Sequence, residues 1–197
     1  MELTTHQETD VRQNIINAAR EIFARYGFRK TTMDEIARAA RKGKSSLYHY
    51  FKSKEEVFQA VVEQEAAEVK AEINRAVAAG RTPEEKFRAY VLTRMTALQR
   101  VANFFRAFKD EYLESYSFIE QLRESYNQYE IATITSILRE GMAKKVFAVK
   151  DLELTAYTIF IAAKGLEYSW ALESDRKKIE TNIDCMLDIL FYGLVRK

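Results

Sequence analysis

The apolar residues of this chain recur mostly every three or four positions, which is the spacing of one face of an α-helix. The first such run goes from Val11 to Tyr26 and stops at Gly27, where a left-handed cap residue is usual. Residues 1–8 show no pattern and are expected to form a loose arm. Longer runs with the same spacing occupy about 53–79, 83–102, 119–144, 151–173 and 178–195. With a short helix expected within 103–117, the pattern predicts an all-α protein of about nine helices.

Two short helices are predicted between the first run and the long ones. Thr32 and Glu35 form a capping box, in which each side chain can satisfy an end amide of the helix. A turn at 41–43 separates this helix from another at about 44–50. Two helices joined by such a Gly-containing turn are typical of a helix-turn-helix.

The composition agrees with a helical chain and excludes several classes of site. Only 6 Gly and 1 Pro interrupt 197 residues. Cys185 is the one cysteine and His6 and His49 are the two histidines, so we expect no disulfide, no metal and no cofactor. No apolar run approaches the roughly 18 residues that cross a membrane, and no export signal precedes the first helix, so we expect a cytoplasmic protein.

The charge is divided unequally along the chain. Residues 9–54 hold eleven Lys or Arg against four acids, a net +7, while the whole chain carries +2, which leaves −5 for the remainder. A basic N-terminal segment followed by an acidic remainder is expected of a protein that places one face on DNA phosphates. The charge alone also fits an ordinary solvated cluster.

The segment from Thr32 to Phe51, TMDEIARAARKGKSSLYHYF, resembles the tetracycline-repressor (TetR) family of regulators. The similarity extends to AREIFARYGF at 19–28 and to KSK at 52–54, about 50 residues in all. It implies an N-terminal three-helix DNA-binding domain at 9–54, with its motif at 32–51. It also implies a C-terminal helical domain at 55–197 for ligand binding and dimerisation. The expected protein is a homodimeric repressor that binds a palindromic operator in double-stranded DNA and is released by a small effector.

The second helix of a helix-turn-helix places its N-terminal residues against base edges in the major groove. Here these residues are Lys44, Ser45 and Ser46. Lys44 can donate to guanine O6 and N7, although a phosphate contact or plain solvation remains an alternative. Gly43 either lets the backbone approach DNA or is needed only for its dihedral angles.

Three ring side chains, Tyr48, His49 and Tyr50, follow on the same helix. Their polar ends can hydrogen-bond phosphates, although each can instead pack inward. The resemblance implies a phosphate contact for Lys54 at the start of the next helix, and the same for Thr32 unless it is only a cap. The candidate DNA-binding residues are therefore Thr32, Lys42, Gly43, Lys44, Ser45, Ser46, Tyr48, His49, Tyr50 and Lys54.

The last two predicted helices are apolar on more than one side, which suits packing against both their own core and a second copy of the chain. The resemblance implies such a homodimer, while a purely internal core is the alternative. Cys185 is expected to pack where these helices meet a second copy rather than to sense redox state. The candidate interface residues are Phe160, Ala163, Trp170, Ile183, Met186, Leu187 and Leu190.

Ten of the 24 aromatic residues lie within 87–129. The resemblance places a ligand cavity in this region, and aromatic walls with a few hydroxyls suit a small apolar or aromatic effector. An ordinary helical core would be aromatic as well. The candidate pocket residues are Tyr90, Phe104, Phe105, Phe108, Tyr112, Tyr126 and Tyr129.

Two other classes of function were weighed against this one. A helical di-iron enzyme would need Glu-x-x-His pairs, and the sequence contains none; it also lacks a Gly-rich phosphate loop and a nucleophile elbow. A DNA-bound factor that recruits or blocks another protein, with no small-molecule effector, stays open as the alternative.

Overall fold

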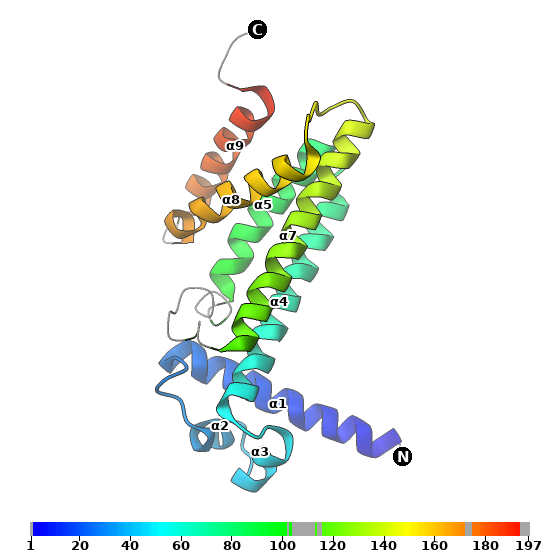
Figure 1. The fold of residues 1–197 in the computed structure, drawn as a ribbon. Helices are drawn as coiled ribbons and strands as arrows, with labels where there is room; N and C mark the ends of the chain where they lie inside the picture. The colour runs from blue at the N-terminus through cyan, green and yellow to red at the C-terminus, as the bar shows by residue number, and fades with distance from the viewer. Residues whose placement is uncertain (1, 102, 104–112, 114–115, 172–174, 194–197) are drawn as a thin grey trace. The chain divides into compact units, whose positions relative to one another are not determined.

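A computed structural model describes residues 2–101, 103, 113, 116–171 and 175–193 (Figure 1). These residues form eight helices and contain no strand, which confirms the all-α prediction. The short helix expected within 103–117 falls largely outside the described residues. The helices are α1 (Glu2–Tyr26), α2 (Met33–Ala39), α3 (Lys44–Tyr50), α4 (Lys54–Ala79), α5 (Pro83–Arg100), α7 (Ser117–Ala143), α8 (Leu152–Ala171) and α9 (Arg176–Tyr192).

The first helix is longer than predicted. It begins at Glu2, so the expectation of a loose arm over 1–8 was wrong. Periodicity failed to find this extension because the segment before Val11 has no apolar period. Two other features permit it: no Gly or Pro interrupts the chain before Gly27, and acidic residues near a helix start interact favourably with the helix dipole.

The predicted helix signals are present as hydrogen bonds. Gly27 has φ +79° and its N–H donates to the Phe23 carbonyl at 2.8 Å, as a left-handed cap does. The Thr32–Glu35 box is complete in both directions. At the start of α4 the box is altered: the Ser53 hydroxyl accepts from Glu56 N–H, but the Glu56 carboxylate accepts from the N–H of the residue before Ser53.

The described chain divides into two compact units. Unit 1 comprises Met1–Ala67 and Val101–Leu122, and unit 2 comprises Glu68–Arg100 and Arg123–Lys197. Helices α4 and α7 contribute residues to both.

Unit 1 is organised around one apolar core. The rings of Phe23 and Phe58 meet edge to face with 5.0 Å between centroids, and Phe28 lies 4.9 Å from Phe58. Burial of these large side chains holds the short helices α2 and α3, which are too short to be stable in isolation. Residues with no exposed surface in this core include Ile15, Ala19, Ile36, Leu47, Val57, Val61 and Ile119.

Unit 2 contains α5 and α7 with the second part of α4, and α8 and α9 pack on α5 (Figure 1). A buried ion pair links α5 to α7, in which two guanidinium nitrogens of Arg94, Nε and Nη2, donate to the Glu130 carboxylate. The Tyr90 phenol donates to the same carboxylate at 3.2 Å. Burial and the neighbouring Glu130 charge raise the pKa of Tyr90 well above its usual value.

Candidate nucleic-acid interface

Helix α3 has one buried side and one exposed side. Leu47 has no exposed surface and Phe51, directly after the helix, is 3% exposed. On the other side, Lys44, Ser45 and Tyr48 are exposed. The core of unit 1 therefore holds α3 with these polar groups directed to solvent.

In the turn between α2 and α3, the left-handed backbone conformation is at Arg41 and not at Gly43. Arg41 takes the left-handed conformation, with φ +53°, and Lys42 N–H donates to the Ala37 carbonyl at 2.9 Å in a Schellman-type end. Gly43 has φ −69°, a value that any residue adopts. The suggestion that Gly43 is needed for its dihedral angles was wrong. A Cβ atom at Gly43 would also meet no atom within 4 Å, so packing inside the chain does not require this glycine.

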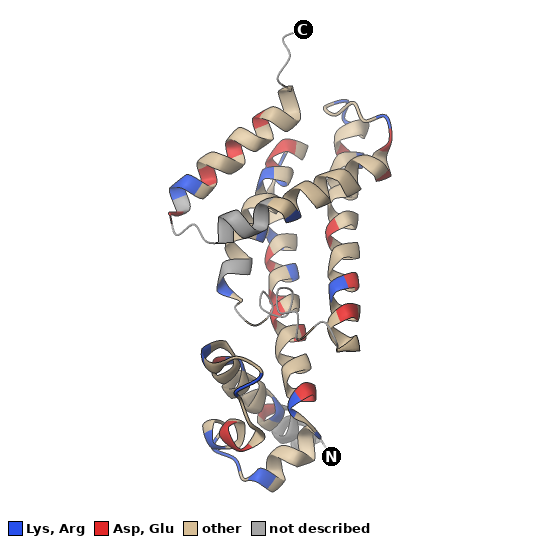
Figure 2. Ribbon diagram, turned by 60° about the vertical axis from the view of Figure 1, so that its left-hand side comes forward, with Lys and Arg blue, Asp and Glu red and all other residues tan. Residues whose placement is uncertain are grey.

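Lys44 is paired with an acid from α2. Its Nζ atom lies 2.9 Å from Asp34 Oδ1 and 3.2 Å from Oδ2, which raises the pKa of Lys44. Both side chains are more than half exposed, at 61% and 57%. They belong to the wall of a surface depression of about 420 Å³, together with Ala37, Arg38 and Lys42. Three cations and one acid surround it, so the depression is cationic (basic residues of α2 and α3 in Figure 2).

Two predicted phosphate ligands have partners inside unit 1. The Thr32 hydroxyl accepts from Glu35 N–H and donates to the Glu35 carboxylate at 2.8 Å, which lowers the pKa of Glu35. Lys54 Nζ donates to the Phe28 carbonyl at 2.9 Å and lies 4.4 Å from the centre of the Phe28 ring. Both residues thus have a structural role in addition to any contact with a nucleic acid.

The three ring residues of α3 differ in exposure. Tyr48 is 44% exposed and His49 is exposed as well. Tyr50 is half-buried, packs against the core of unit 1 and lies 5.0 Å from His49, ring centre to ring centre. Tyr48 and His49 are the more available of the three to a partner.

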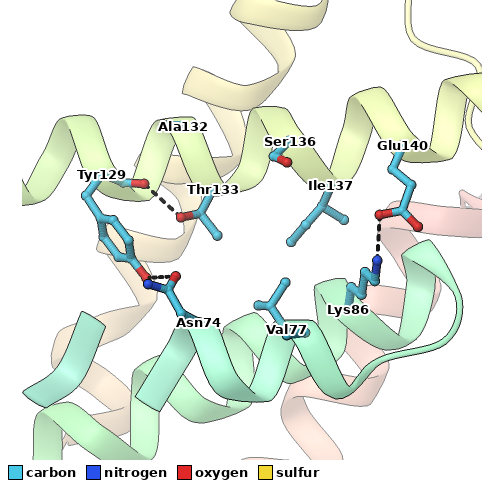
Figure 3. Close-up of a pocket in the computed structure, with 10 residues that line it drawn as sticks. Asn74, Val77, Lys86, Tyr129, Ala132, Thr133, Ser136, Ile137 and Glu140 are labelled. Carbon is cyan, nitrogen blue, oxygen red and sulfur yellow. Dashed lines mark hydrogen bonds and ion pairs between the residues drawn. The ribbon is translucent and has the colours of Figure 1, made fainter. Parts of the chain in front are cut away.

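Unit 2 contains a groove of about 370 Å³ (Figure 3). At one end the Tyr129 hydroxyl donates to Asn74 at 2.8 Å, and at the other Lys86 Nζ lies 2.6 Å from the Glu140 carboxylate, with Val77 and Ile137 between them. The remaining lining residues are Ala78, Ala132, Thr133 and Ser136.

The predicted pocket residues are not brought together in this groove. Tyr129 lines it, whereas Tyr90 and Tyr126 are buried in unit 2 and do not line it. Four more lie outside the described residues, namely Phe104, Phe105, Phe108 and Tyr112.

The predicted interface residues separate into two groups. Phe160, Ala163, Ile183 and Leu187 are at most 5% exposed within the single chain, whereas Leu190 is 43% exposed. Two others complete the set: Met186 is half-buried, and the Trp170 side chain lies outside the described residues. Tyr157, Leu154 and Ile161 are exposed on α8. Sequence reasoning counted Tyr157 among the apolar residues of this helix without placing it at the interface, and it missed Leu154 and Ile161. Periodicity shows that a helix has a wide apolar surface but not which side of it stays exposed.

Asp34 and Arg38 were also missed at the candidate nucleic-acid interface. A signal was present, because Asp34 is an acid in the first turn of a helix whose capping acid is Glu35. The sequence separation of ten residues between Asp34 and Lys44 nevertheless shows no contact until α2 and α3 are placed against each other.

Three expectations from composition concern a metal site, a membrane-spanning helix and Cys185. Within the described ranges, no three His, Cys, Asp or Glu side chains are grouped so as to hold a metal ion. None of the described helices is both long and apolar enough to cross a membrane. Cys185 is exposed on α9.

A basic three-helix unit that directs the polar side of α3 to solvent defines a DNA-binding protein of the helix-turn-helix class. The family described as "Bacterial regulatory proteins, tetR family" matches residues 15–61, which contain most of the core of unit 1 and all of α2 and α3. Residues 15–61 therefore carry a DNA-binding domain of the TetR family, and the comparisons support a transcriptional regulator of that family rather than an enzyme.

Relatives and solved structures extend the similarity along the chain. The HTH-type transcriptional regulator QacR of Staphylococcus aureus is 24% identical over 159 residues, which are 80% of this chain and 84% of that protein. A transcriptional regulator from Cytophaga hutchinsonii is 29% identical with a TM-score of 0.72, covering 90% of this chain and 94% of that one. The regulator FadR from Bacillus subtilis, solved in complex with stearoyl-CoA, shares the fold, with a TM-score of 0.74 at 20% identity over 93% of this chain and 99% of that one.

Proposed function

We propose that the chain is a repressor that binds a palindromic operator as a homodimer and is released by a small apolar or aromatic effector. The observation that carries the proposal is the exposed side of α3, where Lys44, Ser45 and Tyr48 point away from a core that buries Leu47. Lys44 and the serines read base edges in the major groove, and Tyr48 and His49 hold phosphates. Lys42 and Arg38 add positive charge beside them.

Gly43 supports a close approach to DNA. Neither its backbone angles nor its neighbours inside the chain require a glycine. Gly43 is the N-cap of α3, where glycine is accepted although a side-chain cap is preferred, and no side chain caps this helix end. The missing side chain leaves room for a contact from outside the chain. A phosphate at this backbone would be such a contact.

The apolar surface of α8 supports the homodimer. Leu154, Tyr157 and Ile161 are 62%, 52% and 47% exposed and recur at the spacing of one helix face. Gly165 continues this face, and a Cβ there would meet nothing within 4 Å. A mid-helix glycine costs about 1 kcal/mol relative to alanine, and a second copy of α8 in close contact would explain its use. On α9, Ile189 and Leu190 are also exposed, and so extend the surface available to the second copy.

The effector is proposed to bind unit 2. The groove of Figure 3 shows that this unit has a concave surface of the size that small molecules use. The complex of FadR with stearoyl-CoA supports a ligand-binding role for the corresponding part of the fold. We propose that the effector shifts the dimer away from the head separation of about 34 Å that matches successive major grooves, with α4 as the lever.

The test begins with selection of a binding sequence from randomised duplexes, followed by affinity measurements over a range of salt. A palindromic sequence and a log–log salt slope near −5 are expected if about six phosphates are neutralised per bound unit. Tyr48→Phe should weaken binding to all duplexes similarly, and Lys44→Ala should relax preference at one base position. Uniform losses from both variants would contradict base reading by Lys44.

The effector is tested separately. A compound library is screened for melting-temperature shifts of the protein, and the Tyr48–Tyr48 separation of the dimer is measured with and without any hit. An identical separation would exclude the proposed release mechanism. A library without hits would favour the alternative, a DNA-bound factor that acts through another protein.

A further inference from the structure

Asp34 is an acid among the cations of the surface that is proposed to face DNA. It lies in the first turn of α2 beside Glu35, but Glu35 supplies the cap, because its carboxylate accepts from Thr32 N–H at 2.8 Å. Both carboxylate oxygens of Asp34 instead face the Lys44 ammonium, at 2.9 and 3.2 Å. An acid in the first turn also interacts favourably with the dipole of α2. The direct contact with Lys44, in a unit that must approach phosphates, is a separate property of Asp34.

We propose that Asp34 is a positioning and specificity-determining residue, which turns Lys44 from a general phosphate ligand into a reader of one G·C base pair. This inference rests on the proposed function. In the major groove, guanine offers O6 and N7 as acceptors and the paired cytosine offers N4–H₂ as a donor. Lys44 donates to guanine, and Asp34 accepts from cytosine.

The geometry of the two side chains fits this edge. O6 of guanine and N4 of cytosine are joined by a Watson–Crick hydrogen bond, so they lie about 2.9 Å apart. The ammonium and the carboxylate of Lys44 and Asp34 lie at the same separation, 2.9 Å. An A·T pair fits less well, because its adenine N6 donor lies between the two acceptors N7 and O4. The ammonium can then contact only one of these acceptors at a time.

The same contact discourages phosphate binding by Lys44. A carboxylate beside the ammonium repels a phosphate, whereas Arg38 and Lys42 in the same depression remain to bind the DNA backbone. Lys44 therefore contributes less to sequence-independent DNA affinity, whereas Arg38 and Lys42 keep their contribution. The consequence is a larger ratio of operator affinity to background affinity.

The experiment compares Asp34→Asn with a matched control, Glu21→Gln, which removes one negative charge from an exposed position on α1. Binding is measured to the duplex selected by the wild type, to its single-base variants and to a scrambled duplex. Asp34→Asn should raise affinity for scrambled DNA about two- to fivefold, the value of a surface ion pair, and steepen the salt slope by about 1. It should also reduce the preference for G·C about fivefold or more at one position.

The position relaxed by Asp34→Asn must be the one relaxed by Lys44→Ala, and the double variant should lose no more preference there than Lys44→Ala alone. Glu21→Gln should leave every base preference unchanged. Thermal melting of all variants is expected to match the wild type, since Asp34, Lys44 and Glu21 are exposed.

Equal effects of Asp34→Asn and Glu21→Gln would overturn the inference while leaving DNA binding intact, and so would relaxation at a position other than that of Lys44. If the wild type selects no duplex at all, the proposed function fails and the inference falls with it.

Discussion

At the scale of single residues, the backbone conformations of Arg41 and Gly43 in the turn are the reverse of what their side chains suggest. The left-handed conformation belongs to Arg41, at φ +53°, and the residue without a side chain is in an ordinary extended conformation. An arginine is tolerated there because one residue in the left-handed region costs only about 1–2 kcal/mol and the Schellman hydrogen bond offsets part of it. The glycine is the N-cap of α3 but makes no side-chain cap, and the proposal assigns the space beside its backbone to the DNA.

Gly43→Ala is therefore expected to separate stability from function. The added methyl group meets nothing within 4 Å in the free protein, but alanine is a poorer N-cap than glycine, so the melting temperature should fall only slightly. Affinity for the selected duplex should fall at least tenfold, because a Cβ would stand between the backbone and a phosphate; about 1.4 kcal/mol corresponds to that factor. Calorimetry and fluorescence anisotropy measure the two quantities. Unchanged affinity would show that the backbone at this residue does not approach DNA.

At the scale of helices, unit 2 contains both a buried and an exposed ion pair. The Arg94–Glu130 pair joins α5 to α7 with both side chains at most 2% exposed. The Arg88–Asp184 pair joins α5 to α9 with side chains 43% and 49% exposed. Both are bidentate, so the pairs differ mainly in solvation. A buried charge is costly once its counter-charge is removed, and a solvated one is not.

Glu130→Gln should accordingly destabilise the protein by about 3–5 kcal/mol, because the buried guanidinium loses its balancing carboxylate. Asp184→Asn is the matched control and should cost less than about 1 kcal/mol. Chemical denaturation of both variants measures these values. Similar costs for the two would mean that water reaches the Arg94–Glu130 pair.

At the scale of the whole molecule, the prediction concerns association of two chains. Leu154, Tyr157 and Ile161 leave an apolar face on α8 that the chain does not cover. Contiguous exposed apolar surface of this kind marks an interaction site. Because dimeric helix-turn-helix proteins read two half-sites at once, we expect the affinity for a palindrome to depend on this association.

Ile161→Glu places a charge in the centre of this face and should convert the dimer to a monomer. Ala71→Glu, at an exposed position of α4, is the control and should leave the dimer intact. Light scattering coupled to size-exclusion chromatography measures the mass of each variant. Affinity for the palindrome should fall with the loss of the dimer while the helical content is kept. A dimeric Ile161→Glu variant would place the interface elsewhere.

The sequence by itself determined the helices, their caps and the helix-turn-helix. These depend on local chemistry: periodic apolar residues, the Thr32–Glu35 box, the left-handed Gly27 and a family motif with intact spacing. The start of α1 was not predicted because its sequence has no apolar period. Tertiary structure alone decided which residues meet and which side of a helix stays open. It paired Asp34 with Lys44 across ten residues, and it buried Phe160 while leaving Ile161 exposed, since packing chooses among faces that are equally apolar in sequence.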